Sequence, residues 1–403
     1  NEVLMTGGIS RTGLAEELGM SQMAMSRIVR DLFDAGLVEE YGVEVRESGP
    51  GRRQRMLRIR PDGAYSAGIV LSAYSNEICI VKANGDVLVS RIIPVKKITD
   101  SEAAVRKLAK ALNKLIDEND IPRQRIVGVG VAVAAQLDPT NQSVVSSYLL
   151  GWESFDLVEQ VSNITGLPAY AETIANALTL AEVTVGTIKK KENVIVVRSA
   201  TTIAASVLIH GQLVRGQAHQ AGRIGHFRTK KTKLRCSCGS NSCLNCCASG
   251  WSVLARLGKT SNNEYHPDDV AAYAKEINQL IENQACSKAG QTKDANQARI
   301  LKDAGAAIGR SLEQLNQFLE PQVIIVYGSM SRLVDYRDGI SQLLCSDSEG
   351  KATLAKIRYG EISAVRAAGI LALKESIYSP TLDFEQACET ASIASLGTAA
   401  GNN

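Results

Sequence analysis

The chain has 403 residues and a mass of 43.2 kDa, with 45% apolar and 22% charged residues. This composition is ordinary for a globular protein, and the length suits two or three domains of roughly 100–200 residues each. The net charge of +3 excludes a chain that is basic throughout, so any affinity for nucleic acid has to come from a local patch.

Compartment and membrane association are predicted from the apolar runs. No charged leader followed by an apolar stretch opens the chain, and the longest apolar run, residues 126–135, falls short of the ~18 residues that span a bilayer. We therefore expect a cytoplasmic protein with no membrane partner. Since that compartment keeps thiols reduced, clustered cysteines favour a metal over disulfides. The chain begins at Asn1 without a methionine, so native residues are expected to precede it.

Residues 10–37 predict two short helices separated by a turn. The apolar side chains that we expect to face a core recur at helical spacing: Leu14, Ala15 and Leu18 in the first helix, and Ala24, Ile28 and Leu32 in the second. Gly19 can end the first helix, Ser21 caps the second, and Gly36 ends it. This is the helix-turn-helix pattern, in which the second helix enters the major groove of DNA.

The second helix carries side chains suited to DNA. At its start lie groups that can read base edges, and further along lie cations that can contact phosphates. The candidate DNA-binding residues on this helix and at its cap are Ser21, Gln22, Met23, Ser26, Arg27 and Arg30.

Residues 36–60 predict a strand, a turn and a second strand. The segment "ESGPGRRQRMLRIR" has glycine and proline at the tip, and the arginines beside it are Arg52, Arg53, Arg55, Arg58 and Arg60. A basic hairpin in this place is a wing, and its arginines suit a narrow minor groove or the phosphate backbone. The candidate contacts are Arg52, Arg53 and Arg55.

Two alternatives for this front segment are a small helical bundle whose arginines are a solvated surface, and a docking module for another protein. Helical spacing alone does not separate them from a DNA-binding head, because such matches are common by accident. A helix-turn-helix followed directly by an arginine-rich hairpin is a rarer coincidence and favours DNA. Residues 1–60 hold nine arginines and nine acids, so only clustering makes a patch.

After Pro61 the pattern changes to α/β. The next stretch alternates like paired strands around Asn84-Gly85, a strong two-residue hairpin signal. Helical spacing follows over 101–118, and a buried-strand run follows that helix.

The second half of the chain repeats this order loosely. Strands occupy 193–214 with a turn at His210-Gly211, helices occupy much of 250–319, and another buried strand ends in a glycine turn. Two strand-rich halves, each closed by helices, predict two lobes with a cleft between them, and clefts of this kind bind small molecules.

The order of these features resembles the ROK family (repressors, open reading frames and sugar kinases), in particular its repressor branch. The resemblance covers about residues 1–375 and rests on "SRTGLAEELGMSQMAMSRIVRDLFDAGLV", "GVGVAVAAQLDPTNQ", "AETIANALTLAE", "AGRIGHF", "CSCGSNSCLNCCAS" and "LEPQVIIVYGS". It implies an α/β fold in which an N-terminal winged helix-turn-helix precedes a two-lobed, actin-like and ribonuclease-H-like ATPase body. The implied parts are a DNA-binding domain at 1–62, a first lobe at 63–186, a second lobe with a zinc site at 187–378 and a disordered tail at 379–403.

Five of the nine cysteines lie between residues 235 and 250, which is too dense for core filling. In the family, a histidine in a Gly-His step and three cysteines hold a structural zinc. The resemblance places these ligands at His226, Cys236, Cys238 and Cys243, with gaps of ten, two and five residues. One imidazole and three thiolates make a closed tetrahedral site, so the expected cofactor is a structural Zn²⁺. Cys246 and Cys247 are expected to be bystanders, and His219 is the nearest competing ligand.

The resemblance also implies that kinase chemistry is lost. Where family kinases carry a glycine-rich phosphate loop after the first strand, this chain has "LSAYSN" with bulky Tyr74. The second phosphate segment, 198–206, contains no glycine, and the later Gly-Gly is Gly328-Ser329. Ile174 stands in place of the catalytic base and cannot accept a proton from a sugar hydroxyl. We expect no catalytic residue and no enzyme; the rival is an active ROK sugar kinase carrying a DNA-binding head.

The sugar contacts of the family are largely replaced as well. The candidate effector-pocket residues are Glu172, Thr173, Asn176, Arg223, His226 and Asn245. Arg223 and Asn245 stand where the family has glutamates, so ordinary hexose binding is expected to be poor. Two alternatives stay open: the pocket takes an anionic or phosphorylated sugar attracted by Arg223, or no effector binds. Arg223 could equally pair with Glu172 or another acid and serve structure.

These features together predict a transcriptional regulator of the repressor kind. The expected partners are a double-stranded DNA operator, a sugar or sugar-phosphate effector, and further copies of the chain. A homodimer or homotetramer would place paired recognition helices on a roughly palindromic operator. The helices at 296–319 and 361–377 have apolar stripes that serve either such contacts or the core. An effector is expected to act by shifting the lobes and changing the spacing of the heads.

Overall fold

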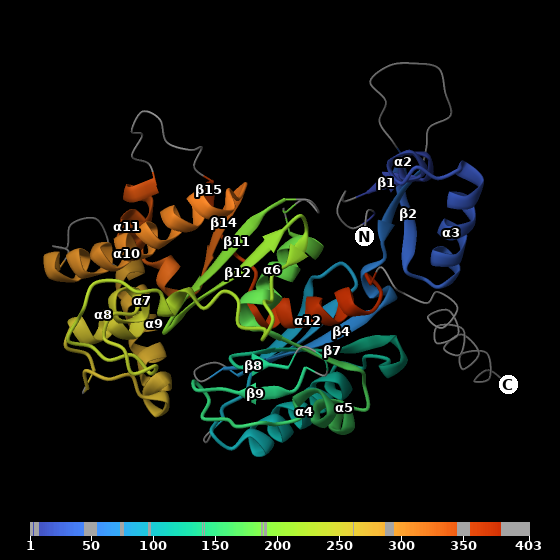
Figure 1. Ribbon diagram of the computed structural model, residues 1–403. Helices are drawn as coiled ribbons and strands as arrows, with labels where there is room; N and C mark the ends of the chain where they lie inside the picture. The colour runs from blue at the N-terminus through green and yellow to red at the C-terminus, as the bar shows by residue number, and fades with distance from the viewer. Residues whose placement is uncertain are drawn as a thin grey trace, which may run out of the picture.

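The computed structural model describes residue 3 and residues 8–43, 55–72, 76–95, 98–138, 140, 142–186, 188, 192–260, 262–286, 294–344 and 355–379. Several features predicted above lie outside these residues: the wing tip with Arg52 and Arg53, Tyr74, and the tail from 380 onward. Figure 1 shows a small N-terminal head beside a larger body built on two sheets. No helix within the described residues is long and apolar enough to cross a membrane.

Within the residues that the structure describes, the head combines a pair of helices with a three-stranded antiparallel sheet, as expected for a winged helix-turn-helix. Its elements are β1 (Ile9–Ser10), α2 (Arg11–Glu17), α3 (Gln22–Asp34), β2 (Val38–Val43) and β3 (Arg55–Ile59), and the strand order is β1-β3-β2. The Ser10 and Ser21 hydroxyls accept backbone hydrogen bonds and cap the two helices. Gly19 and Gly36 take positive φ angles of 63° and 71°, which let the chain turn after each helix.

The buried face of α3 differs from the predicted one. The head core consists of Val3, Leu14, Ala15, Met25, Val29, Val38 and Leu57. Ile28, which the four-residue repeat placed in this core, is exposed, and so is Leu18 in the turn after α2. A strict repeat of four drifts around a helix of 3.6 residues per turn, whereas Met25, Val29 and half-buried Leu32 follow the helix.

The body contains two five-stranded sheets with the same strand order. Its first half comprises η1 (Pro61–Gly63), β4 (Tyr65–Leu71), β5 (Glu77–Lys82), β6 (Val87–Ile92), α4 (Ser101–Glu118), η2 (Arg123–Arg125), β7 (Ile126–Val133), β8 (Gln136–Leu137), β9 (Val144–Ser146), α5 (Leu157–Thr165), β10 (Ala169–Thr173) and α6 (Ile174–Val185). The first sheet has the order β6-β5-β4-β7-β10. Its first three strands pair antiparallel, and β4, β7 and β10 are parallel.

The second half repeats this arrangement. It comprises β11 (Val194–Ser199), β12 (Ile203–Ile209), β13 (Gln212–Leu213), η3 (Ile224–His226), α7 (Leu244–Ala248), α8 (Gly250–Arg256), η4 (Pro267–Asp269), α9 (Val270–Cys286), α10 (Ala295–Leu319), β14 (Val323–Tyr327), η5 (Ser329–Arg332), α11 (Val334–Leu344), β15 (Lys356–Tyr359) and α12 (Ala364–Glu375). The sheet order is β13-β12-β11-β14-β15, with the same split between antiparallel and parallel pairs. The two lobes are therefore a duplicated actin-like unit, as the resemblance implies.

The predicted hairpin turns are present in both lobes. β5 and β6 pair antiparallel around Asn84-Gly85, where Gly85 has a φ of 84°. β12 and β13 pair around His210-Gly211, and both residues of this turn have positive φ. The paired positive φ angles at His210-Gly211 twist that two-residue turn in the sense of the flanking strands. β5 and β6 are instead joined by the four residues 83–86, with positive φ at Gly85.

A core shared by the two lobes surrounds α6 and α12. Residues from both sheets, including Val70, Ala132, Val196 and Ile325, belong to one hydrophobic cluster with these helices. Figure 1 shows α12 lying along β4 and β7, with α6 beside it. A Cβ atom at Gly130 would stand 1.8 Å from a backbone oxygen of α12, so glycine permits this close packing.

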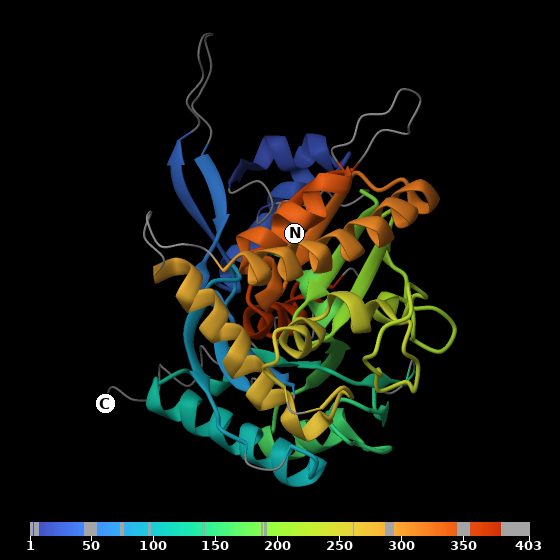
Figure 2. The ribbon, with the colours of Figure 1, turned by 90° about the vertical axis from the view of Figure 1, so that its left-hand side faces the viewer.

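The outer faces of the lobes are covered by the remaining helices. In Figures 1 and 2, α4 and α5 cover the face of the first sheet that points away from the second lobe. The apolar stripe at 361–377 is core packing, because most of α12 is buried in the shared core. The stripe at 296–319 likewise packs α10 into the core of the second lobe, although Phe318 near its end is 84% exposed.

Candidate metal centre and nucleic-acid interface

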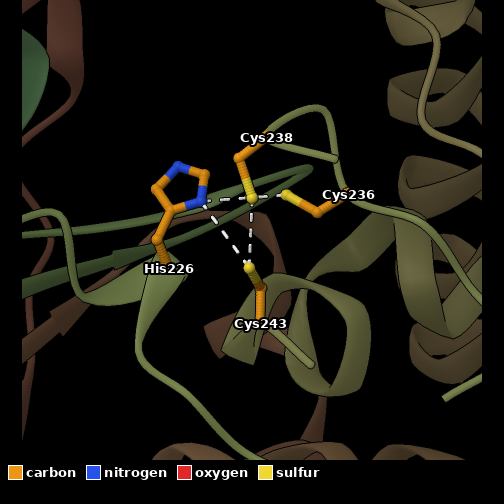
Figure 3. Close-up of side chains that lie close together, drawn as sticks. All are labelled: His226, Cys236, Cys238 and Cys243. Carbon is orange, nitrogen blue, oxygen red and sulfur yellow. Dashed lines mark hydrogen bonds between the residues drawn. The ribbon is translucent and has the colours of Figure 1, made fainter. Parts of the chain in front are cut away.

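Four side chains of the second lobe converge on one point. The ligand atoms of His226, Cys236, Cys238 and Cys243 all lie within 4.8 Å of one another, and Figure 3 shows the side chains pointing toward a common centre. The Nδ1 atom of His226 lies 3.8 Å from the Sγ atom of Cys236 and 3.9 Å from that of Cys243. The Sγ atoms of Cys238 and Cys243 are 3.2 Å apart.

These separations fit a tetrahedral zinc ion. With Zn–S bonds of about 2.3 Å and a Zn–N bond of about 2.0 Å, the ligand atoms of a tetrahedron stand roughly 3.5–3.8 Å apart. One imidazole and three thiolates are also a donor set that structural zinc prefers. The four residues therefore form the zinc-binding cluster predicted from the sequence. Four protein ligands leave no position for an activated water, so the role of the metal is structural.

Two glycines bring the ligands together. A Cβ atom at Gly225 would stand 2.3 Å from a backbone oxygen of β12, so glycine is needed for His226 to sit where it does. Gly239 has a φ of 81°, and its N–H donates to the Cys236 carbonyl at 2.8 Å, which closes the turn that carries two ligands. Cys243 lies at the N-cap of α7, so the start of that helix positions the last ligand.

The pKa values of two cluster thiols are shifted in opposite directions. A hydrogen bond with Cys246 lowers the pKa of Cys236 to about 3, while burial raises the pKa of Cys243 to about 12. Neighbouring thiolates repel one another, and a bound divalent cation favours their ionised form. Cys247 is buried nearby and contacts Thr229 instead, and neither it nor Cys246 belongs to the ligand cluster.

A second group of polar side chains lies at the carboxyl end of β10. Glu172 is 5% exposed, and its Oε1 atom accepts hydrogen bonds from Thr173 N at 2.8 Å and Asn176 Nδ2 at 2.9 Å. Its Oε2 atom accepts from Arg215 Nε at 3.1 Å and Nη2 at 2.9 Å. Every carboxylate oxygen thus has two donors, and the ion pair joins β10 in the first lobe to the loop after β13 in the second. Sequence reasoning missed Arg215, because a lone arginine after a turn carries no pattern.

The other candidate effector residues lie on the second lobe. Arg223 is exposed and donates to Gln220, so the alternative in which Arg223 pairs with Glu172 is wrong: Arg215 takes that place. Asn245 is buried, and its Oδ1 atom accepts from the backbone N–H at the start of β12. His226 points into the metal cluster. Of the six candidates, Glu172, Thr173 and Asn176 are in mutual contact, while Asn245 and His226 serve the scaffold of the second lobe.

The kinase positions that the structure describes hold structural groups. Ile174 is buried in the core shared by the lobes. The segment 198–206 runs from β11 into β12, and the Ser199 hydroxyl contacts the buried Tyr336 hydroxyl at 2.7 Å. Gly328 has a φ of 103° and packs against the backbone of Ser199, where a Cβ atom would stand 2.1 Å from the carbonyl oxygen. At these positions the described groups pack against the core or against neighbouring backbone.

The face of α3 opposite the head core is open to solvent. The exposed side chains on this face are Gln22, Met23, Ser26, Arg27 and Arg30, with Met23 85% exposed. Within the part of the chain that the structure describes, neither Arg27 nor Arg30 forms an ion pair. The Ser21 hydroxyl accepts from Ala24 N at 3.2 Å and serves as the helix cap. The surface therefore presents two uncommitted cations beside groups that can hydrogen-bond to bases.

Two arginines of the wing strand β3, Arg55 and Arg58, pair with acids on the adjacent strand. Arg55 Nη1 lies 2.6 Å from Glu40 Oε2, and Arg11 lies 2.8 Å from the other oxygen of the same carboxylate. Arg58 pairs with Glu39 at 2.6 Å. The side chain of Arg55 is 71% exposed, so its pair is solvated and weak. Arg55 can therefore exchange its carboxylate partner for a phosphate.

Comparisons with known proteins point to one family. The sequence model of the ROK family matches residues 67–375. The chain is 25% identical over 330 residues to the xylose repressor of Bacillus subtilis, covering 82% of this chain and 80% of that protein. It is 22% identical over 329 residues to the DNA-binding transcriptional dual regulator NagC of Escherichia coli, covering 81% of this chain and 78% of NagC.

Solved structures share the fold. A crystal structure of a ROK family transcriptional regulator, a homologue of the E. coli MLC protein, matches with a TM-score of 0.65 at 17% identity over 95% of this chain and 93% of that one. A ROK family glucokinase from Streptomyces griseus matches with a TM-score of 0.61 at 18% identity over 76% of this chain and 99% of that one. The regulator match covers more of this chain than the glucokinase match does, so the similarity in fold extends beyond the α/β body.

Proposed function

The chain belongs to the ROK family, and we propose on that premise that it is a DNA-binding transcriptional regulator of the repressor type. We divide it into a DNA-binding domain at 1–62, two body lobes at 63–186 and 187–378, and a tail from 379. The body provides oligomerisation and effector sensing and does not phosphorylate sugars. The curated relatives named above are regulators, whereas the structural neighbours include kinases of the same family.

The observation that carries the proposal is the exposed face of α3. Its side chains, Gln22, Met23, Ser26, Arg27 and Arg30, stand clear of the head core on the helix that enters the major groove in helix-turn-helix proteins. Arg55, together with Arg52 and Arg53 outside the described residues, extends the cationic surface along the wing. Ser21 contributes by fixing the start of the helix.

An inactive body is supported by the residue that replaces the catalytic base. Ile174 has no proton acceptor and is packed into the shared core. The alternative function, an active ROK sugar kinase with a DNA-binding head, is favoured by the fold similarity to glucokinase. A coupled ATP assay with a panel of hexoses and amino sugars separates the two, and sugar-dependent turnover above background would contradict our proposal.

The effector, on this proposal, is related to a sugar and carries negative charge. Glu172 has donors on both oxygens, so its ability to accept sugar hydroxyls is already used, while exposed Arg223 has no acid partner among the described residues. The partners are then a DNA operator, this effector and one or three further copies of the chain, since paired heads match a roughly palindromic operator. Calorimetry with sugar phosphates and neutral sugars tests the charge preference, and tight binding of plain glucose would count against it.

The DNA interface is tested by salt-dependent binding to genomic fragments. Replacing Arg27 and Arg30 by alanine should lower the slope of log K against log salt by roughly 1.8, because each phosphate contact contributes about 0.9. The matched control replaces Arg106 and Lys110, two exposed cations on α4, and should leave the slope unchanged. Equal slopes in all three proteins, or no binding by the wild type at modest salt, would sink the proposal.

A further inference from the structure

The turn between β5 and β6, residues 83–86, lies where three parts of the molecule meet. We call it the junction turn. On one side is η1, the short segment that follows β3 and connects the head to the body. On the other sides are α12 and the end of α6, the two helices at the centre of the core that both lobes share.

The junction turn is bonded to η1. Ala83 N donates to the Pro61 carbonyl at 3.0 Å, and Lys82 Nζ, just before the turn, lies 3.0 Å from Asp62 Oδ1. Arg125 from η2 donates to the Asp62 carbonyl at 3.3 Å. Both peptide and side-chain groups of η1 are therefore held by the first lobe.

The segment η1 is equally attached to the head. Arg60 N donates to the Leu37 carbonyl at 2.9 Å, directly before the start of β2. A Cβ atom at Gly63 would stand 2.3 Å from the Gly36 carbonyl oxygen, so the two backbones touch at the turn that ends α3. A displacement of η1 is thus passed to both α3 and the wing strands.

Two side chains from the C-terminal end of the body donate hydrogen bonds to the junction turn. Arg366 on α12 donates from Nε to the Gly85 carbonyl at 2.7 Å and lies 3.4 Å from the Asp86 carboxylate. Tyr378, three residues after α12, is 6% exposed, and its hydroxyl donates to the Ala83 carbonyl. Ala83 is therefore bonded through its N–H to the head connection and through its carbonyl to the shared core.

The C-terminal end of α6 packs against the remaining side of the junction turn. A Cβ atom at Gly85 would stand 2.6 Å from Val185 Cγ1, so the turn and the last residue of α6 leave no space between them. The same helix begins directly after Thr173, beside the Glu172–Arg215 pair that joins the two lobes. α6 thus reaches from the contact between the lobes to the junction turn.

We propose that the junction turn sets the orientation of the head, with Tyr378 and Arg366 as its positioning residues. Because α6 and α12 pack against both sheets, a change in the angle between the lobes displaces them, and the turn passes this displacement to η1. The inference deepens the proposed function, since its consequence for regulation rests on DNA binding by the head. The mechanical coupling itself does not depend on DNA.

The test compares Tyr378→Phe with Tyr336→Phe in the full chain. Each change removes one buried hydroxyl that donates to a backbone carbonyl, at Ala83 and at Ala248 respectively, and leaves the ring in place. Hydrogen exchange measured by mass spectrometry should quicken at least about threefold in peptides covering 58–64 and the head for Tyr378→Phe alone. A duplex selected by the wild type from a random pool should change in affinity about fivefold for this variant and not for Tyr336→Phe.

A second pair of variants covers the case in which Tyr378→Phe unfolds the protein. Arg366→Ala removes the hydrogen bond from α12 to the Gly85 carbonyl. Asp62→Asn weakens the contact between η1 and Lys82. Both variants should quicken hydrogen exchange in the head. Unchanged exchange in the head for Tyr378→Phe and Arg366→Ala, or equal quickening by Tyr336→Phe, would overturn the inference. If the wild type selects no duplex, the proposed function fails while the exchange data still decide the coupling.

Discussion

The zinc-binding cluster and the Glu172–Arg215 group differ in how their charges are balanced. In the first, the ligand atoms of His226 and three cysteines converge on one point, the arrangement that a metal ion completes. In the second, Glu172 accepts hydrogen bonds from Arg215 and two further donors, so the protein supplies every partner itself. A cluster of like ligands indicates a metal site, whereas a buried charge with complete partners indicates internal structure.

The largest expected effect comes from breaking the metal cluster. Cys243→Ser should release zinc and destabilise the second lobe by about 3–5 kcal/mol, a fraction of the ~10 kcal/mol that zinc supplies to zinc-finger peptides at pH 7. Metal content by mass spectrometry and urea unfolding measure the change. Cys247→Ser, a buried cysteine outside the cluster, is the control and should keep the metal with a loss of about 1 kcal/mol. Equal zinc content in both variants would contradict the assignment.

Glu172→Gln tests the self-sufficient group. The amide keeps the shape but leaves Arg215 without a counter-charge, which should cost about 1–3 kcal/mol, less than for a fully buried pair because Arg215 is 37% exposed. Urea unfolding gives the value. The control is Glu276→Gln, whose pair with Lys259 has the same 2.9 Å length but a carboxylate side chain that is 33% exposed, against 7% for Glu172, and it should cost less than about 1 kcal/mol. A smaller loss for Glu172→Gln than for the control would show that the pair is not structural.

A double-mutant cycle sharpens the claim that the group acts as a unit. Asn176→Ala removes one hydrogen bond to Glu172 and should cost about 1 kcal/mol by urea unfolding. The double variant with Glu172→Gln and Asn176→Ala should lose roughly 0.5–1 kcal/mol less than the sum of the two single losses, since both changes weaken one network. Strict additivity would mean that the two side chains do not cooperate.

The smallest effect is expected at the exposed Asp62–Lys82 pair next to the junction turn. Hydrogen bonding to Lys82 holds the pKa of Asp62 below its ordinary value, and Tyr65 and Arg60 also act on this carboxylate. A lowered folded-state pKa stabilises the protein above the unfolded value of about 3.9, and this stabilisation is lost as pH falls through the folded value.

Asp62→Asn should therefore destabilise slightly at about pH 7, by well under 1 kcal/mol, and match the wild type at about pH 3. Thermal unfolding at the two pH values measures the difference, which should be reduced by added salt. A gap between the two proteins that persists in acid would assign the effect to packing instead of charge.

Local patterns and the family resemblance together predicted the metal cluster and the architecture. The capping serines and the hairpin dipeptides act within a few residues, so they could be read directly, whereas the resemblance to the ROK family identified the four metal ligands. The face of α3 was predicted one residue off, because the apolar residues Ala24 and Ile28 sit next to the truly buried Met25 and Val29. Arg215 lies 43 residues from Glu172, and nothing short of the folded sheets brings them together.

The place of α12 in the first lobe has a consequence for biosynthesis. The first sheet, which begins at β4, packs against α12, a helix some 300 residues later in the chain. The hydrogen bond from the Ser66 hydroxyl to the Gly369 carbonyl, across 303 residues, illustrates this contact. During translation α12 is not yet available to pack against Gly68 and Gly130, so one apolar face of the first sheet remains exposed to solvent. A nascent chain that stalls before residue 364 should therefore recruit chaperones, and truncations at that point should accumulate as aggregates.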